Sequence, residues 1–98
     1  MTPIEWRGDL EDDCSAKVGN LLAHCERLAD CFIADADEPR KRSPVSVWYV
    51  SVCPVDENNR PTGDDLFHSG EPGGLIIGGT MARAIAEAII RAYARPVA

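Results

Sequence analysis

The sequence predicts one α+β domain, an antiparallel sheet of three to four strands with an N-terminal and a C-terminal helix, in the order α-β-β-β-α. Three observations support this fold class. Apolar residues recur every three or four positions over residues 9–30, residues 45–53 are rich in Val, Trp and Tyr, and an Ala- and Ile-rich segment ends before Pro96. At 98 residues, the chain is long enough for one small domain, 1–98, with one core.

The first helix is predicted over residues 9–30, after an N-terminal arm at 1–8. Asp9 is a suitable N-cap, and three carboxylates follow it in the first turn, where the helix dipole favours negative charge. The steps between apolar positions are three or four residues, which is the helical period. These positions are Leu10, Cys14, Val18, Leu21, Cys25, Leu28 and Phe32.

The strands are predicted in the middle of the chain. Residues 31–36 are expected to begin as the end of the helix and to continue as a short strand. Residues 37–44, which contain two prolines, are expected to form a loop. Residues 45–53 carry apolar side chains on both faces, which is typical of a central strand. A long hairpin loop at 54–65 leads to short strands at 66–69 and 75–77.

The second helix is predicted from Thr80, as N-cap, to about Arg95. Gly78 and Gly79 before it are expected to have positive φ, since the segment has neither the Lys of a P-loop nor the G-x-G-x-x-G pattern of dinucleotide sites. Most of the helix surface is apolar, so it needs cover either from the first helix or from a second copy. The residues expected to self-associate in a homodimer are Met81, Ile85, Ile89, Ile90 and Tyr93.

Charge is unevenly distributed along the chain. The first 38 residues hold ten carboxylates and three basic side chains, and the net charge is −6. Direct nucleic-acid binding is disfavoured, because it relies on an excess of Lys and Arg. The carboxylates form either a solvated surface or a face that binds a basic surface of a protein partner. The residues of this expected acidic face are Asp9, Glu11, Asp12, Asp13, Asp35, Asp37 and Glu38.

The cysteines and histidines give no clear metal or catalytic pattern, so no catalytic, cofactor or metal residue is assigned. On a helix, Cys14 and Cys25 would lie ~16 Å apart, too far for a disulfide or a shared metal, so core packing is favoured. A small-ligand or metal-binding module stays as the alternative function, and a hydrolase-like enzyme around His68 as a remote one. The groups involved would be His24, Cys31, Cys53 and His68, with Asp64, Asp65 and Ser69 beside His68.

The expected location is the cytoplasm, without a membrane partner. The first ten residues lack the basic and apolar regions of a signal peptide, and no apolar run reaches the ~20 residues of a membrane span. Four thiols in a cytosolic chain are expected to stay reduced.

Three segments, AKVGNLLAHCERLAD, VWYVSV and ARAIAEAIIRAYA, together resemble small α-β-α sandwich proteins of bacteriophages and other mobile elements. The resemblance spans about residues 10–95 and rests on an aromatic strand and an Ala/Ile/Arg helix. It implies a non-enzymatic accessory protein. Some such proteins bind and block host machinery, including CRISPR complexes, so a phage-type inhibitor is the function that the resemblance implies.

Overall fold

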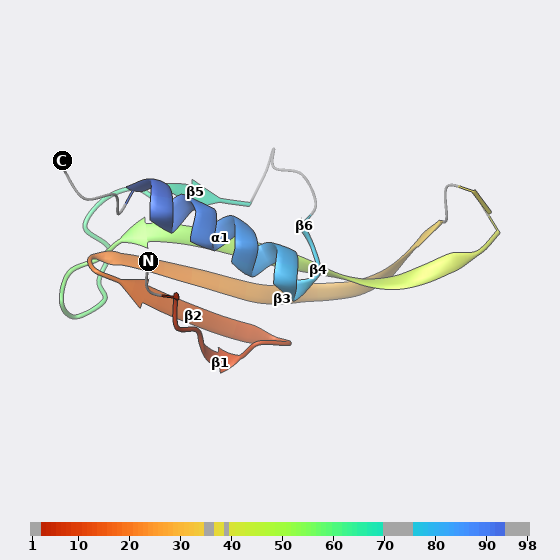
Figure 1. Cartoon of the computed structure of the whole chain (residues 1–98), viewed down its shortest axis with the longest axis horizontal. Helices are drawn as coiled ribbons and strands as arrows, with labels where there is room; N and C mark the ends of the chain where they lie inside the picture. The colour runs from red at the N-terminus through yellow and green to blue at the C-terminus, as the bar shows by residue number, and fades with distance from the viewer. Residues whose placement is uncertain (1–2, 35–36, 39, 70–75, 94–98) are drawn as a thin grey trace.

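The computed structural model describes residues 3–34, 37–38, 40–69 and 76–93, and shows one antiparallel sheet with one helix on one face (Figure 1). The strand order is β1-β2-β3-β4-β5, and β6 also pairs with β4. The α+β class is confirmed, but the N-terminal helix is wrong. The elements are β1 (Arg7–Asp9), β2 (Asp13–Val18), β3 (Leu21–Ala34), β4 (Arg42–Pro54), β5 (Phe67–His68), β6 (Ile76–Ile77) and α1 (Gly79–Tyr93).

Residues 9–30 form the end of β1, then β2 and most of β3 instead of a helix. Val18 pairs with Leu21 across a two-residue turn, Gly19-Asn20, in which Gly19 has a φ of 60°. Gly-Asn between two alternating runs is a β-hairpin signal, because glycine adopts the positive φ that such turns need. The side chains that face the helix alternate along both strands, at Cys14 and Ala16 in β2 and at Leu21, Ala23 and Cys25 in β3.

The predicted central strand at 45–53 is confirmed, and it extends further as β4 from Arg42 to Pro54. The segment that follows contains an isolated bridge between Val55 and Pro61, as a hairpin-like connection requires. The short strands expected at 66–69 and 75–77 correspond to β5 and β6, and Leu75 lies outside the described residues. Both strands pair with the outer edge of β4 at different positions along it.

The C-terminal helix is confirmed over Gly79–Tyr93, and its start differs in detail. The Ala82 N–H donates to the Gly78 carbonyl at 3.1 Å, so Gly78 and not Thr80 precedes the helix. Gly78 has the expected positive φ of 86°, whereas Gly79 is absent from the positive-φ residues. Gly79 is instead needed for close approach, since a Cβ there would lie 2.9 Å from the Trp48 ring. Arg95 lies outside the described residues.

The core lies between α1 and the face of the sheet below it. Ala82, Ala86 and Ile90 are buried at four-residue spacing, and two of them are small enough to bring the helix close to the strands. On the sheet side, the core includes Trp48 and Val50. Strands β3 and β4 run beyond the helix as a long two-stranded ribbon, which Figure 1 shows as a projection from the body of the molecule.

We call this projection the distal hairpin and define it as residues 28–34 of β3 and 42–47 of β4. It gives the molecule principal extents of 51 × 27 × 26 Å. Arg27 pairs with Trp48 and Ala29 pairs with Val47, so Leu28 is the extra residue of a β-bulge at the base.

Candidate functional site

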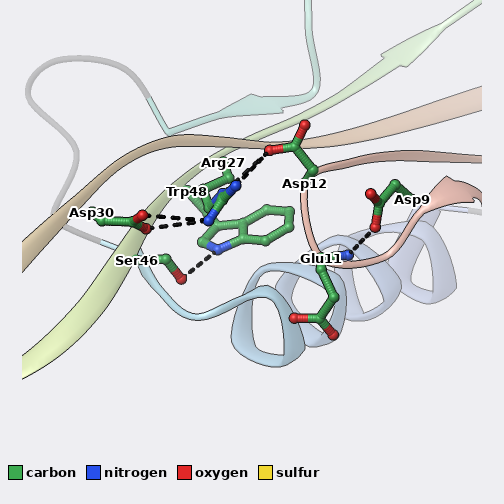
Figure 2. A network of polar contacts seen from close by, with 7 residues as sticks. All are labelled: Asp9, Glu11, Asp12, Arg27, Asp30, Ser46 and Trp48. Atoms are coloured by element: carbon green, nitrogen blue, oxygen red, sulfur yellow. Dashed lines mark hydrogen bonds and ion pairs between the residues drawn. The ribbon is translucent and has the colours of Figure 1, made fainter.

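Four of the predicted acidic residues gather where β1 turns into β2. We call Asp9, Glu11, Asp12 and Asp13 the acidic turn. The turn is held by contacts within it, because the Asp9 side-chain Oδ1 accepts the Glu11 N–H at 2.9 Å and the Asp9 carbonyl accepts the Asp12 N–H at 3.1 Å. In Figure 2, the Glu11 carboxylate points away from Asp12, Arg27 and Asp30.

Arg27 fastens the acidic turn to the base of the distal hairpin (Figure 2). Its Nη2 lies 3.1 Å from Asp12 Oδ1, and its Nη1 lies 3.4 Å from Asp30 Oδ2. The Arg27 N–H also donates to the Asp12 carbonyl at 2.7 Å. The hydrogen bond that Arg27 donates to the Asp12 carboxylate and the charge of Asp30 raise the pKa of the Arg27 guanidinium above its ordinary value. One cation is thus shared between two carboxylates.

A shallow hollow of about 240 Å³ lies at this junction, lined by Asp12, Arg27, Leu28, Ala29 and Asp30. Leu28 is 60% exposed, and Leu10, within the acidic turn, is also exposed. Arg83 approaches from α1 and donates to the Leu10 carbonyl at 2.6 Å. The junction therefore combines apolar side chains with carboxylates that outnumber the two guanidinium groups bonded there.

The remaining acidic residues lie elsewhere. Asp35 lies outside the described residues, and Asp37 and Glu38 are at the far end of the distal hairpin. At a rise of ~3.3 Å per residue, Ala34 is ~23 Å along β3 from Arg27. The structure therefore does not bring Asp37 and Glu38 together with the acidic turn.

The five helix residues expected to self-associate fall into two groups. Ile90 is 1% exposed, and Ile85 and Ile89 pack against the core within the same chain. Met81 and Tyr93 are exposed. Self-association through this helix stays a prediction, with Met81 and Tyr93 as its exposed part.

Cys14 and Cys25 are direct cross-strand partners in β2 and β3, so the expected ~16 Å separation is wrong. Both are buried, as core packing requires. Burial raises the pKa of Cys25 to about 12, with the Cys14 thiol contributing in the same direction. Burial also raises the pKa of Cys14, against the opposing effect of Arg83. The sequence signal that would have predicted this pairing is Gly19-Asn20, the two-residue turn that brings β2 and β3 side by side and so places Cys14 opposite Cys25.

The other cysteines and histidines are dispersed. His24 Nε2 lies 2.7 Å from Asp13 Oδ1, and Cys31 is on the distal hairpin. Burial raises the pKa of Cys53, and the charge of Asp65 adds to this. Over the described ranges, no group of three or more His, Cys, Asp or Glu side chains is placed to hold a metal ion.

Ser69, the residue after His68, forms hydrogen bonds with the backbone of β4. The Ser69 hydroxyl accepts the Val50 N–H at 2.8 Å, and the Ser69 N–H donates to the Val50 carbonyl at 2.9 Å. Ser69 therefore joins the chain after β5 to β4, and His68 precedes it at the end of β5.

No family model, curated protein or solved structure matches the chain. Within the described part of the chain, no helix has the length and apolar character needed to cross a bilayer. Of the three segments that carry the resemblance to phage α-β-α proteins, the first is a β-hairpin, so its helix-first order does not apply here.

Proposed function

We propose that this chain is a non-enzymatic protein-binding module that recognises a basic surface on a partner protein through the acidic turn and the adjoining Leu10 and Leu28. The observation that carries the proposal is the junction between the acidic turn and the base of the distal hairpin, where the exposed Leu10 and Leu28 adjoin carboxylates that share one guanidinium. Figure 2 shows these carboxylates and Arg27. Protein interfaces combine an apolar centre with a polar rim, and complementary charge increases association rate and specificity.

The negative charge at this junction is available to a partner. Asp12 and Asp30 are both bonded to Arg27, while the Glu11 side chain has no bond to another side chain in the network of Figure 2. An incoming Lys or Arg could bind Glu11 without breaking a contact within the chain. Glu11 is therefore a cleaner position for mutation than Asp12 or Asp13, which bond to Arg27 and His24.

The test compares Glu11→Lys with Glu57→Lys, a matched control with the same change in net charge in the exposed loop after β4. The probe is a fluorescent arginine-rich peptide, and binding is measured by anisotropy at low salt. We expect Glu11→Lys to weaken binding about tenfold, because reversal replaces an attraction by a repulsion, each ~0.5–1 kcal/mol at an exposed site. Glu57→Lys should change binding less than twofold. Equal losses would show that net charge alone decides binding.

The resemblance to phage accessory proteins suggests a class of partner. We propose host machinery with a basic, nucleic-acid-binding surface, CRISPR complexes included, on which this protein would act as an inhibitor. A cytoplasmic location belongs to the same proposal, and the four free cysteines fit a reducing compartment. An inhibitor of this kind should compete with DNA for its partner in a filter-binding assay.

A further inference from the structure

We propose that two copies of this chain associate edge to edge through β3 of the distal hairpin, so that two hairpins form one four-stranded antiparallel sheet. This surface does not include the acidic turn, although it begins at Leu28, which adjoins that turn, and the inference goes beyond the proposed function. It rests on the direction of backbone hydrogen-bonding groups, on the residues at each edge and on the register that a two-fold axis imposes.

Among the described residues, the outer edge of β3 has no partner strand along the distal hairpin. Strand β2 pairs with β3 only as far as Glu26, opposite Asp13. The Arg27 N–H then donates to the Asp12 carbonyl, where the turn leads away from β3. From Leu28 to Ala34, no strand among the described residues pairs with this edge. An open edge of this kind is a template for another strand.

The direction of the free groups follows from β4. The Ser46 carbonyl accepts the Gly78 N–H at 2.9 Å, so the backbone groups of Ser46 point away from β3. Asp30 is its cross-strand partner, and in an antiparallel pair both residues then direct their N–H and C=O outward. Because the direction alternates, Phe32 and Ala34 also present their backbone groups at the open edge of β3.

The outer edge of β4 is blocked at two of the three corresponding positions, Ser46 and Pro44. Pro44, the partner of Phe32, has no N–H to donate, and the Ser46 carbonyl is already bonded to Gly78. Proline is a common means by which proteins protect an edge strand. The distal hairpin therefore has one edge that is blocked at two positions and one edge that can both donate and accept.

The open edge is self-complementary. Its seven residues, 28–34, have Cys31 at their midpoint, so full overlap with a second copy places the two-fold axis at Cys31. Asp30 then lies opposite Phe32 of the other copy, and Ala29 lies opposite Ile33. Each directly opposed pair avoids two like charges, which would be destabilising. Phe32 is 65% exposed in one chain, and the second copy would cover part of it.

The same register brings the two Cys31 residues together. Cys31 directs its own backbone groups toward Val45 of β4, so across the new interface it forms a non-hydrogen-bonded pair. Such pairs have Cα atoms about 4.5 Å apart, which is within the range that a disulfide spans. Cys31 is half-exposed, so an added oxidant can reach it.

The first experiment uses this proximity. Purified protein is treated with diamide, which takes two protons and two electrons from a thiol pair and is reduced to the hydrazine, and is then run on non-reducing gels. We expect a covalent dimer in the wild type and in Cys53→Ser, and its loss in Cys31→Ser. A dimer that persists in Cys31→Ser, or that depends on Cys53, would overturn the proposed register.

The second experiment measures the association itself by sedimentation equilibrium over a range of protein concentrations. Phe32→Asp places two carboxylates opposite each other and should weaken the dimer at least tenfold, whereas Phe32→Lys places Lys opposite Asp30 and should keep it. Tyr93→Asp, at an exposed helix position, and Glu11→Lys should also keep it. Circular dichroism confirms that each variant is folded. A wild type that stays monomeric, or a dimer lost in Tyr93→Asp but kept in Phe32→Asp, overturns the proposal.

Discussion

Cys25 is a fully buried residue of the core between sheet and helix, with Cys14 opposite it across the strand pair and the Arg83 charge acting on both thiols. Its pKa of about 12 reflects burial first and the neighbouring thiol second. The protein therefore keeps a nucleophilic group protonated and shielded at neutral pH, which agrees with a role in packing.

This raised pKa makes stability fall at high pH. The Cys25 pKa is higher in the folded chain than in the unfolded chain, where it is near 9.0, so its contribution is complete below pH 9 and is lost as pH rises toward 12. We expect the free energy of unfolding of the wild type to fall more steeply over this window than that of Cys25→Ala. Urea unfolding at pH 7, 9, 10 and 11 measures the difference, and parallel curves would contradict it.

Gly79 lies so close to its neighbours that adding one methyl group should destabilise the fold. A Cβ there would meet the Trp48 ring at 2.9 Å, Arg83 Nη1 at 3.1 Å and the Leu10 carbonyl at 3.1 Å. We expect Gly79→Ala to cost about 1–3 kcal/mol, as overpacking of a well-packed site does. Chemical denaturation measures this cost. Gly63→Ala is the control, since its nearest neighbour would be a Pro54 side-chain atom at 3.8 Å.

At the scale of elements, the β2–β3 hairpin shows why part of the fold escaped prediction. Two alternating strands joined by a two-residue turn place apolar residues at 14 and 18, then at 21 and 25, which matches the helical period. β4 and α1 have no such ambiguity, and both were predicted. Periodicity alone could not decide the first segment, whereas the turn residues Gly19-Asn20 could.

The acidic turn was found from sequence only in part. The carboxylates of residues 9–13 are adjacent in the chain, so their clustering needed no fold. Their link to Arg27 and Asp30 depends on the hairpin register, which a helix over the same residues cannot provide. The exposed Leu28 was likewise assigned to a helix stripe, although it is the extra residue of a bulge.

The hairpin turn itself can be tested by one substitution. Gly19 has a φ of 60° and no atom within 4 Å of an added Cβ, so any cost of Gly19→Ala comes from the backbone and not from a clash. We expect a loss of about 1 kcal/mol in the free energy of unfolding. Asn20→Ala is the matched control, because Asn20 is not among the positive-φ residues, and it should lose less than half as much.

On the scale of the whole molecule, stability and exposed apolar surface are located in different places. The core lies between α1 and the sheet, while Leu28, Phe32 and Ile33 of the distal hairpin are exposed. An isolated two-stranded hairpin is at most marginally stable in water, so the distal hairpin depends on the body for its order.

This separation predicts unequal effects of two truncations. Ile90→Ala removes a buried side chain and should cost about 2–5 kcal/mol. Phe32→Ala removes a larger but exposed side chain and should change the free energy of unfolding of the monomer by less than about 0.5 kcal/mol. Urea titration at low protein concentration measures both, and a loss above 1 kcal/mol for Phe32→Ala would show that the distal hairpin packs on the body.

The bulge at Leu28 affects the direction in which the distal hairpin projects, but not which side chains the hairpin presents on each face. Bulges bend and twist a strand, so removing Leu28 would straighten the ribbon. The pairs beyond it, from Ala29 with Val47 to Ala34 with Arg42, would keep their partners and their faces. Deletion of Leu28 alone would thus change the direction of the distal hairpin while it kept the same side chains. A single deletion of this kind could adapt the protein to a partner of different shape.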